Sequence, residues 1–285
     1  MFQIQTPIHS NIVAGVVFLS LFISSCGEKA EGISDLKDFE VTKDTIKSET
    51  RVNFDLIRVN IPSPGRLAKK LSAAKIGYNK SFLLAIEKRS NYVTNYQKAI
   101  GVGVFGADIG MAASHNQTQD ALDALDAVNK LSTELGINNA YDPELSKKIL
   151  ANINKPDTIQ QMLDKAFDKA ERNLRSNQRV ATSVLMVAAG WVEGLYTSVE
   201  SLHSNPDVGE NTRSIYKDIS AHCHAFEYVF QLLNEYKSNA DCAKLLQELE
   251  PAKATLLAYG KNGCSSDTLS KLRETVTDLR NKIVA

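Results

Sequence analysis

The sequence has no excess of charge of either sign, because 33 lysines and arginines balance 33 aspartates and glutamates. Proteins that hold nucleic acid through its phosphates need surplus lysine and arginine, so the balance argues against nucleic acid as a partner. Turn-forming residues are also scarce, with only 7 prolines and 15 glycines. An all-β sandwich needs many closely spaced turns, and the composition therefore favours a helical chain.

Known catalytic motifs are missing too. The sequence contains no GxSxG, HExxH, P-loop or paired CxxC motif, so no motif argues for catalysis, although this does not exclude an enzyme. Residues Gly101–Gly106 match GxGxxG, but the dinucleotide fingerprint follows a strand, and the residues before Gly101 read as helical. His222 and His224 flank a cysteine, yet on a helix they point about 200° apart and cannot bind one ion together. We expect no cofactor and no metal.

The first 25 residues carry no lysine, arginine, aspartate or glutamate. Within them, Ile12 to Ile23 is a nearly unbroken apolar run of about twelve residues. A helix of that length spans roughly 18 Å, well short of a hydrocarbon core of about 30 Å. The length is typical of the apolar region of a secretion signal, although the segment before it has only His9 and no lysine or arginine. The alternative is a buried core helix.

The apolar run ends at Ile23-Ser24-Ser25-Cys26. This resembles the lipobox of bacterial lipoprotein signals, in which an aliphatic residue and two small residues precede the cysteine that is acylated. The resemblance implies that residues 1–25 are a cleaved signal peptide and that Cys26 carries two or three acyl chains, enough for stable anchoring in a membrane. Gly27 follows, rather than the aspartate that some bacteria use to retain lipoproteins in the inner membrane. We therefore expect a cell-envelope protein anchored in the outer membrane, on either its periplasmic or its surface face.

The rest of the chain divides into a tether and one domain. Residues 26–50 are mostly polar and are expected to form a flexible tether. Over residues 51–285, apolar residues recur at helical spacing, which predicts a single all-α domain, a multi-helix bundle. At residues 52–61, apolar and polar residues alternate at first, which suggests a short strand or an extended arm. The expected helices cover residues 66–74, 80–88, 95–115, 118–135, 142–153, 156–203 with an interruption near 176–177, 212–237, 240–259, and a last helix with Ser266 as its N-cap.

Two of these stretches, residues 99–113 and 184–196, are apolar on nearly every face and rich in glycine. A helix that is apolar all round is expected to be buried all round, so we predict that they form the central pair of the bundle. Glycine inside a helix costs about 1 kcal/mol relative to alanine, a cost that close approach of two backbones explains. The small residues that share a face are Gly103, Ala107 and Gly110 in the first stretch, and Gly190 and Gly194 in the second.

Each apolar stretch holds one ionisable residue, Asp108 in the first and Glu193 in the second. A buried carboxylate without a partner is costly, so each must find a partner or remain protonated. One interpretation is a polar pocket between the central helices that binds a ligand. The other, which we favour, is that each acid is hydrogen-bonded internally and fixes the helix register. The weak binding candidates are Asp108, His115, Trp191, Glu193 and Tyr196.

Besides Cys26 the sequence contains Cys223, Cys242 and Cys264. An exported protein can form disulfides, but three cysteines leave one unpaired. Cys242 and Cys264 lie near opposite ends of one predicted helical region, where about twenty helical residues hold them roughly 30 Å apart. We predict no particular disulfide.

Three short sequence segments outside the signal carry a family resemblance: Ile61-Pro-Ser-Pro64, the run from Gly103 to Gly110, and the run from Gly190 to Tyr196. With the signal, they resemble a group of uncharacterised helical lipoproteins from Bacteroidetes, from about residue 55 onward. The resemblance implies an all-α fold and an envelope location, and it brings no known activity. We expect a lipid-anchored helical protein that binds a ligand or an envelope protein. The alternative is an enzyme that uses Asp108 and Glu193, with His115, as acid–base groups.

Overall fold

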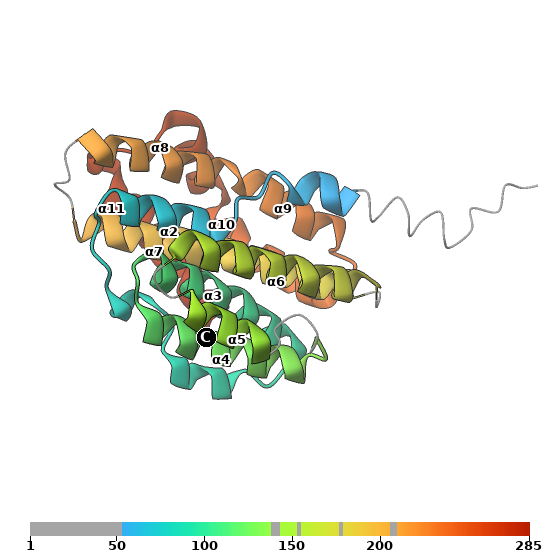
Figure 1. Ribbon diagram of the computed structural model, residues 1–285. Helices are drawn as coiled ribbons and strands as arrows, with labels where there is room; N and C mark the ends of the chain where they lie inside the picture. Colours follow the sequence, from blue (N-terminus) through green and yellow to red (C-terminus); the bar gives the residue numbers. More distant parts are fainter. Residues whose placement is uncertain (1–52, 138–142, 153–154, 177–178, 206–209) are drawn as a thin grey trace, which may run out of the picture. The chain divides into compact units, whose positions relative to one another are not determined.

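The structure is a computed structural model that describes residues 53–137, 143–152, 155–176, 179–205 and 210–285. Every regular element in these residues is a helix, which confirms the predicted all-α bundle (Figure 1). The expected signal peptide, lipidated Cys26 and tether lie outside the described residues. The elements are α2 (Pro64–Ala73), η1 (Lys80–Phe82), η2 (Ile86–Asn91), α3 (Asn95–Ser114), α4 (Thr118–Glu134), α5 (Pro143–Ala151), α6 (Pro156–Ser176), α7 (Val180–His203), α8 (Glu210–His224), α9 (Phe226–Glu235), α10 (Ala240–Asn262) and α11 (Ser266–Ile283).

Helices α3 and α7 pack against each other more extensively than any other two elements in the described residues. Every residue of α3 from Ala99 to Ser114 is buried. The backbones touch at Gly103, where an added Cβ would lie 2.3 Å from the carbonyl oxygen of Met186 and 2.9 Å from the amide nitrogen of Gly190. By length and composition α7 is able to cross a membrane, but 72% of its most apolar window is buried, as in the core helix of a folded domain.

The other helices surround this pair. Helix α4 packs on α3, α11 packs on α7, and α2 and α6 each contact both central helices. Helix α10 contacts α8, α9 and α11, so that the C-terminal third of the chain covers α7 from another side (Figure 1). The last helix begins with a capping box in which Ser265 and Thr268 exchange hydrogen bonds. The predicted N-cap, Ser266, is therefore wrong by one residue.

Residues 53–58 are helical, so the predicted strand or extended arm is wrong for the described part of that segment. The buried residues show why. Phe54, Ile57 and Ile61 are 0%, 7% and 3% exposed and follow one another at intervals of three and four residues, whereas Leu56 is 63% exposed. Burial thus follows the helical period of 3.6 rather than the strand period of 2. The apparent alternation arose because the segment is too short for the two periods to be separated.

Two predicted helices are broken. Residues 80–88 form parts of the separate 3₁₀ helices η1 and η2, and the backbone N–H of Leu84 between them donates to a side chain, Asp108, instead of to a helical carbonyl. The predicted helix over 212–237 is interrupted at Ala225, between α8 and α9. Its apolar stripe continues through the break, with Ile219 and Phe226 both 0% exposed, so periodicity alone did not reveal the interruption.

Candidate functional site

The two acids of the central helices meet in the core. Glu193 on α7 is 0% exposed, and both of its carboxylate oxygens accept from Arg280 on α11, Oε2 from Nε at 3.1 Å and Oε1 from Nη2 at 3.2 Å. Such a bidentate pair is among the stronger charge-assisted contacts in proteins. The Arg280 guanidinium also lies 4.8 Å from the centre of the Tyr196 ring. The cation that Glu193 requires is therefore supplied 87 residues further along the chain.

Asp108 on α3 completes this group. Its Oδ2 accepts from the backbone N–H of Leu84 at 3.0 Å, and its carboxyl is hydrogen-bonded to that of Glu193. No N–H or O–H group of the described residues reaches Asp108 Oδ1. Two carboxyl groups form a hydrogen bond only when one of them holds a proton, so the proton resides on Asp108 and is donated to Glu193.

The electrostatics of the pair agree with this assignment. Burial, reinforced by the charge of Glu193, holds the pKa of Asp108 well above its usual range. Burial also raises the pKa of Glu193, but the adjacent Arg280 guanidinium opposes that rise. The group therefore consists of a neutral acid, a carboxylate and a guanidinium, with net charge zero. It joins α3, α7 and α11 to the loop at Leu84.

Asp108 also borders a cavity of about 380 Å³ between the 80–87 segment and α4, beside Asp120 and Asp123. Its side chain is only 1% exposed there. His115 does not border this cavity. Instead, its ring lies between the carbonyl oxygens of Met111 and Ile76, at 2.9 and 3.1 Å, and next to the ring of Tyr78.

Trp191 lies in a different part of the core. It is 0% exposed, and its ring stacks on that of His222 with centroids 5.0 Å apart. His222 Nε2 donates to the backbone carbonyl of Trp191 at 3.1 Å, and burial lowers the pKa of His222 to about 4. Of the five residues predicted from the sequence, Asp108, Glu193 and Tyr196 are thus brought together around Arg280, and His115 and Trp191 are not.

A separate cavity, with a volume of about 130 Å³, lies between the start of α2 and helices α3, α6 and α7. We call it the glycine-walled cavity. Much of its wall is backbone, because glycines from both central helices face it, and the remaining wall is largely apolar. The residues that form this inner wall are Gly65, Gly103, Gly106, Gly110, Leu163, Met186, Val187 and Gly190. Of these glycines, the sequence predicts Gly103, Gly110 and Gly190 to lie on small helix faces, and it gives no sign of a cavity.

Helix α6 covers the cavity and carries Asp164 and Asp168 at its edge, both of them exposed. Phe167 from the same helix takes the place that a side chain at Gly106 would occupy, since an added Cβ there would lie 2.0 Å from the Phe167 ring. Small residues on α3 therefore make room both for a ring of α6 and for the cavity beside it.

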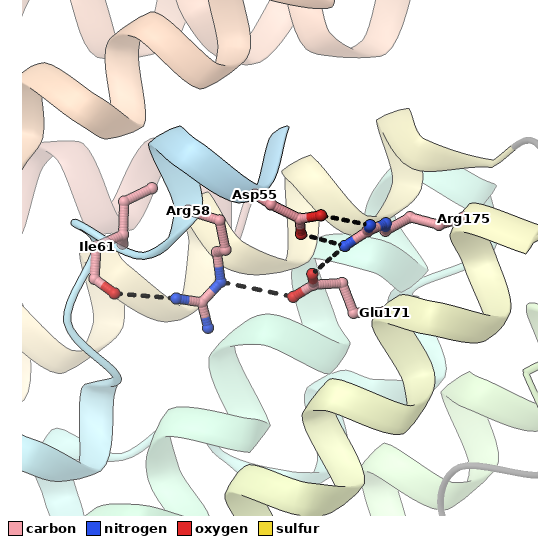
Figure 2. A network of polar contacts seen from close by, with 5 residues as sticks. All are labelled: Asp55, Arg58, Ile61, Glu171 and Arg175. Atoms are coloured by element: carbon pink, nitrogen blue, oxygen red, sulfur yellow. Dashed lines mark hydrogen bonds and ion pairs between the residues drawn. The ribbon is translucent and has the colours of Figure 1, made fainter. Parts of the chain in front are cut away.

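A chain of ion pairs fixes the 53–58 helix against α6 next to this cavity. Figure 2 shows Arg175 between the carboxylates of Asp55 and Glu171, with Arg58 reaching the other side of Glu171. Arg58 Nη1 also donates to the carbonyl oxygen of Ile61 at 2.9 Å. Arg58 and Ile61 both border the glycine-walled cavity, so the network holds one of its walls in place.

Comparison with known proteins gives no further information on the site, because no family model, curated protein or solved structure matches the chain. The candidate sites are therefore defined by their geometry alone.

Proposed function

We propose that this protein is a lipid-anchored component of the cell envelope that binds a small, largely apolar ligand in the glycine-walled cavity. The anchor is supported by the apolar run that ends at Cys26. The ligand site is supported by the cavity of about 130 Å³ between α2, α3, α6 and α7. Such concave, mainly apolar sites between the helices of a bundle are common locations for small-molecule binding.

The observation that carries this proposal is the composition of the cavity wall. Gly106 and Gly110 lie inside α3, where each glycine costs about 1 kcal/mol of helix stability relative to alanine. Gly103 needs its small size for the contact with α7, and Gly106 needs it for the Phe167 ring. At Gly110 the nearest atom to an added Cβ is the Cα of Gly65, at 3.1 Å, and both glycines border the cavity. These glycines allow α7, the Phe167 ring and α2 to pack closely on α3, and the backbone that they leave uncovered forms one wall of the cavity.

The test is to fill the cavity. Val187 borders it and is only half-buried, so Val187→Phe adds bulk without disturbing the centre of the core. Val180 begins the same helix, is also half-buried, and does not border the cavity, which makes Val180→Phe the matched control. We expect 1-pentanol to bind the wild type and Val180→Phe, and Val187→Phe to weaken binding by about tenfold or more. Equal binding to all three proteins would rule out this site.

The alternative, an enzyme that uses Asp108 and Glu193, has less support. Both oxygens of Glu193 are occupied by Arg280, and the side chains of Asp108 and Glu193 are 1% and 0% exposed. A general acid or base must come within hydrogen-bonding distance of its substrate. His115, the third group of that hypothesis, binds backbone carbonyls elsewhere. The internal role in fixing helix register accounts for the observed contacts better.

A further inference from the structure

We infer that His115 is a pH-sensitive clasp, which holds a strap on helices α3 and α4 firmly when its ring carries two protons and less firmly when it carries one. The strap is the segment of residues 76–91, which contains η1 and η2 and lies between α2 and α3 in the chain. The inference does not depend on the glycine-walled cavity, because the strap borders the other cavity, the one beside Asp108.

His115 has a backbone carbonyl oxygen at each of its ring nitrogens. Nδ1 lies 2.9 Å from the oxygen of Met111, one turn earlier on α3, and Nε2 lies 3.1 Å from the oxygen of Ile76, the first residue of the strap. A carbonyl oxygen only accepts hydrogen bonds, whereas a neutral imidazole has one N–H and one lone pair. A neutral ring therefore satisfies one carbonyl and turns a lone pair towards the other, and a ring with two protons donates to both.

Two helix ends meet at this ring. His115 is the C-cap residue of α3, whose last turn contains no other basic residue. Ile76 closes the end of α2, since its backbone N–H donates to the carbonyl oxygen of Leu71. Lys70, in the last turn of α2, is already paired with Asp218. The C-terminal end of a helix favours a positive charge, so the second proton of His115 adds charge where both helices favour it.

The rest of the strap is held by acidic residues of the same two helices. The contacts fasten Tyr78 and Lys80 to Asp120, the backbone N–H of Leu84 to Asp108, and Arg89 to Asp126. Burial opposes the ionisation of Asp120, but the hydrogen bonds from Lys80 and Tyr78 outweigh it and lower the pKa of this carboxyl. Asp120 therefore stays ionised near neutral pH, where a histidine changes its charge.

The other ionisable groups at this junction come from the strap and from α7. The ring of Tyr78 lies 5.8 Å from that of His115 between centroids, and burial raises the pKa of Tyr78, which therefore stays neutral. Lys75, next to Ile76, is exposed. The end of α7 approaches the strap at Gly77 and carries a second histidine, His203, in its last turn. A test of the clasp must therefore distinguish these two histidines.

Opening of the strap would uncover the cavity of about 380 Å³ that it forms with α4. It would also expose the apolar side chains of Ile76 and Leu84, which are 2% and 5% exposed in the closed arrangement. Histidines lose their second proton between about pH 5 and 8, so the clasp predicts that the strap opens more often as the pH rises through this range.

The experiment measures amide hydrogen exchange of residues 76–91 in the purified protein at about pH 5.5 and about pH 8, with each rate corrected for intrinsic exchange at that pH. We expect the protection of the strap in the wild type to be about fivefold higher at the lower pH. His115→Gln keeps a hydrogen-bond donor but cannot gain a charge, so the difference is expected to disappear. His203→Gln is the matched control and is expected to keep it.

Nitrogen-15 NMR of the histidine rings supplies a second measurement, which needs no substitution and decides the point even if His115→Gln does not fold. We expect both ring nitrogens of His115 to carry protons at about pH 5.5 and only one of them at about pH 8. The inference is wrong if one nitrogen lacks a proton at the lower pH, or if the wild type is equally protected at both pH values. It is also wrong if His115→Gln keeps the difference or if His203→Gln removes it.

Discussion

Asp108 and Glu193 lie side by side in the centre of the bundle, and one proton lies between their carboxyl groups. The contact is possible because Arg280 holds Glu193 in its ionised form, while burial and the Glu193 charge keep Asp108 neutral. The arrangement links the two apolar helices to α11 through a group without net charge. It follows that the three side chains are not equivalent, and that replacing each of them has a different cost.

Asp108, the neutral residue of the three, can be replaced most easily. An asparagine side chain keeps the size of a protonated aspartate and still offers a donor to Glu193. At pH 7 the variant also needs no proton uptake on folding, so we expect Asp108→Asn to leave the free energy of unfolding unchanged or to raise it. Arg280→Met leaves the Glu193 carboxylate buried without its cation and is expected to cost about 3–5 kcal/mol. Denaturant unfolding of the two variants beside the wild type provides the comparison. If Asp108→Asn is as damaging as Arg280→Met, Asp108 is ionised and our proton assignment is wrong.

The same pair affects the dependence of stability on pH. The pKa of Asp108 is raised in the folded protein above its ordinary value of 3.8. Above pH 3.8 the unfolded state therefore binds fewer protons at this residue, so its contribution to stability is complete below that pH and is lost as the pH rises through the folded pKa. Asp108→Asn is expected to remove this contribution, which makes the variant gain stability relative to the wild type as the pH rises. A constant difference between the two proteins across that range would contradict the assignment.

His222 affects the pH dependence of the free energy of unfolding in the opposite direction. Burial lowers its pKa to about 4, so the ring is neutral in the folded protein at pH values where an unfolded histidine is already protonated. Between about pH 6.5 and pH 4 the unfolded state binds more protons, and stability is lost as the pH falls through this window. We expect His222→Gln to reduce this loss, and His224→Gln, at the exposed neighbouring histidine, to leave it unchanged. Direct NMR titration of the His222 ring gives an independent value, and a pKa near 6.5 would contradict the prediction.

The contact between the central helices predicts a strong effect at Gly103. Alanine at an exposed helical position is favoured over glycine by about 1 kcal/mol, but at Gly103 the added Cβ would lie 2.3 Å from the carbonyl oxygen of Met186. Backbone cannot move aside as a flexible side chain does, so we expect Gly103→Ala to destabilise the protein by about 1–3 kcal/mol or more. Gly77→Ala is the control, because its nearest neighbour is the Asn205 side chain at 3.5 Å. If Gly103→Ala leaves the free energy of unfolding unchanged, α3 and α7 are further apart than in this structure.

The sequence allowed the two acids to be identified but not their partner. Asp108 and Glu193 were conspicuous as single ionisable residues in apolar stretches, and the cost of burying a charge predicted that each needs a partner or a proton. Arg280 was missed because it lies on a helix with many other charged residues. The one available signal was its place four residues after the buried Val276, at the edge of the apolar stripe.

The cavity could not be predicted from the sequence, for a different reason. Gly103, Ala107 and Gly110 were predicted to form one small helix face, yet the glycines of α3 serve different contacts: Gly103 with the backbone of α7, Gly106 with the Phe167 ring, and Gly110 with Gly65 of α2. Which of these a glycine serves depends on the helix that lies opposite, and the sequence of α3 does not contain that information. The helical period at residues 53–58 could not be recognised for a similar reason, since the burial of Phe54 depends on Arg175 of α6 and on Tyr236 at the end of α9, which lie far along the chain.

The lipid anchor gives the last prediction, and it depends only on the first residues of the chain. If Ile23-Ser24-Ser25-Cys26 is a lipobox, the mature protein begins at Cys26 and its first peptide carries the mass of two or three acyl chains. Cys26→Ser removes the thiol that receives the lipid, so the variant is expected to keep residues 1–25 or to leave the membrane fraction. Ser25→Ala keeps a small residue before the cysteine and is the matched control, expected to be processed normally. Mass spectrometry of the N-terminal peptide, together with fractionation, provides the measurement. An unmodified N-terminus at any other residue would remove the anchor from the proposed function and leave the cavity experiments unaffected, because these depend on α2, α3, α6 and α7 alone.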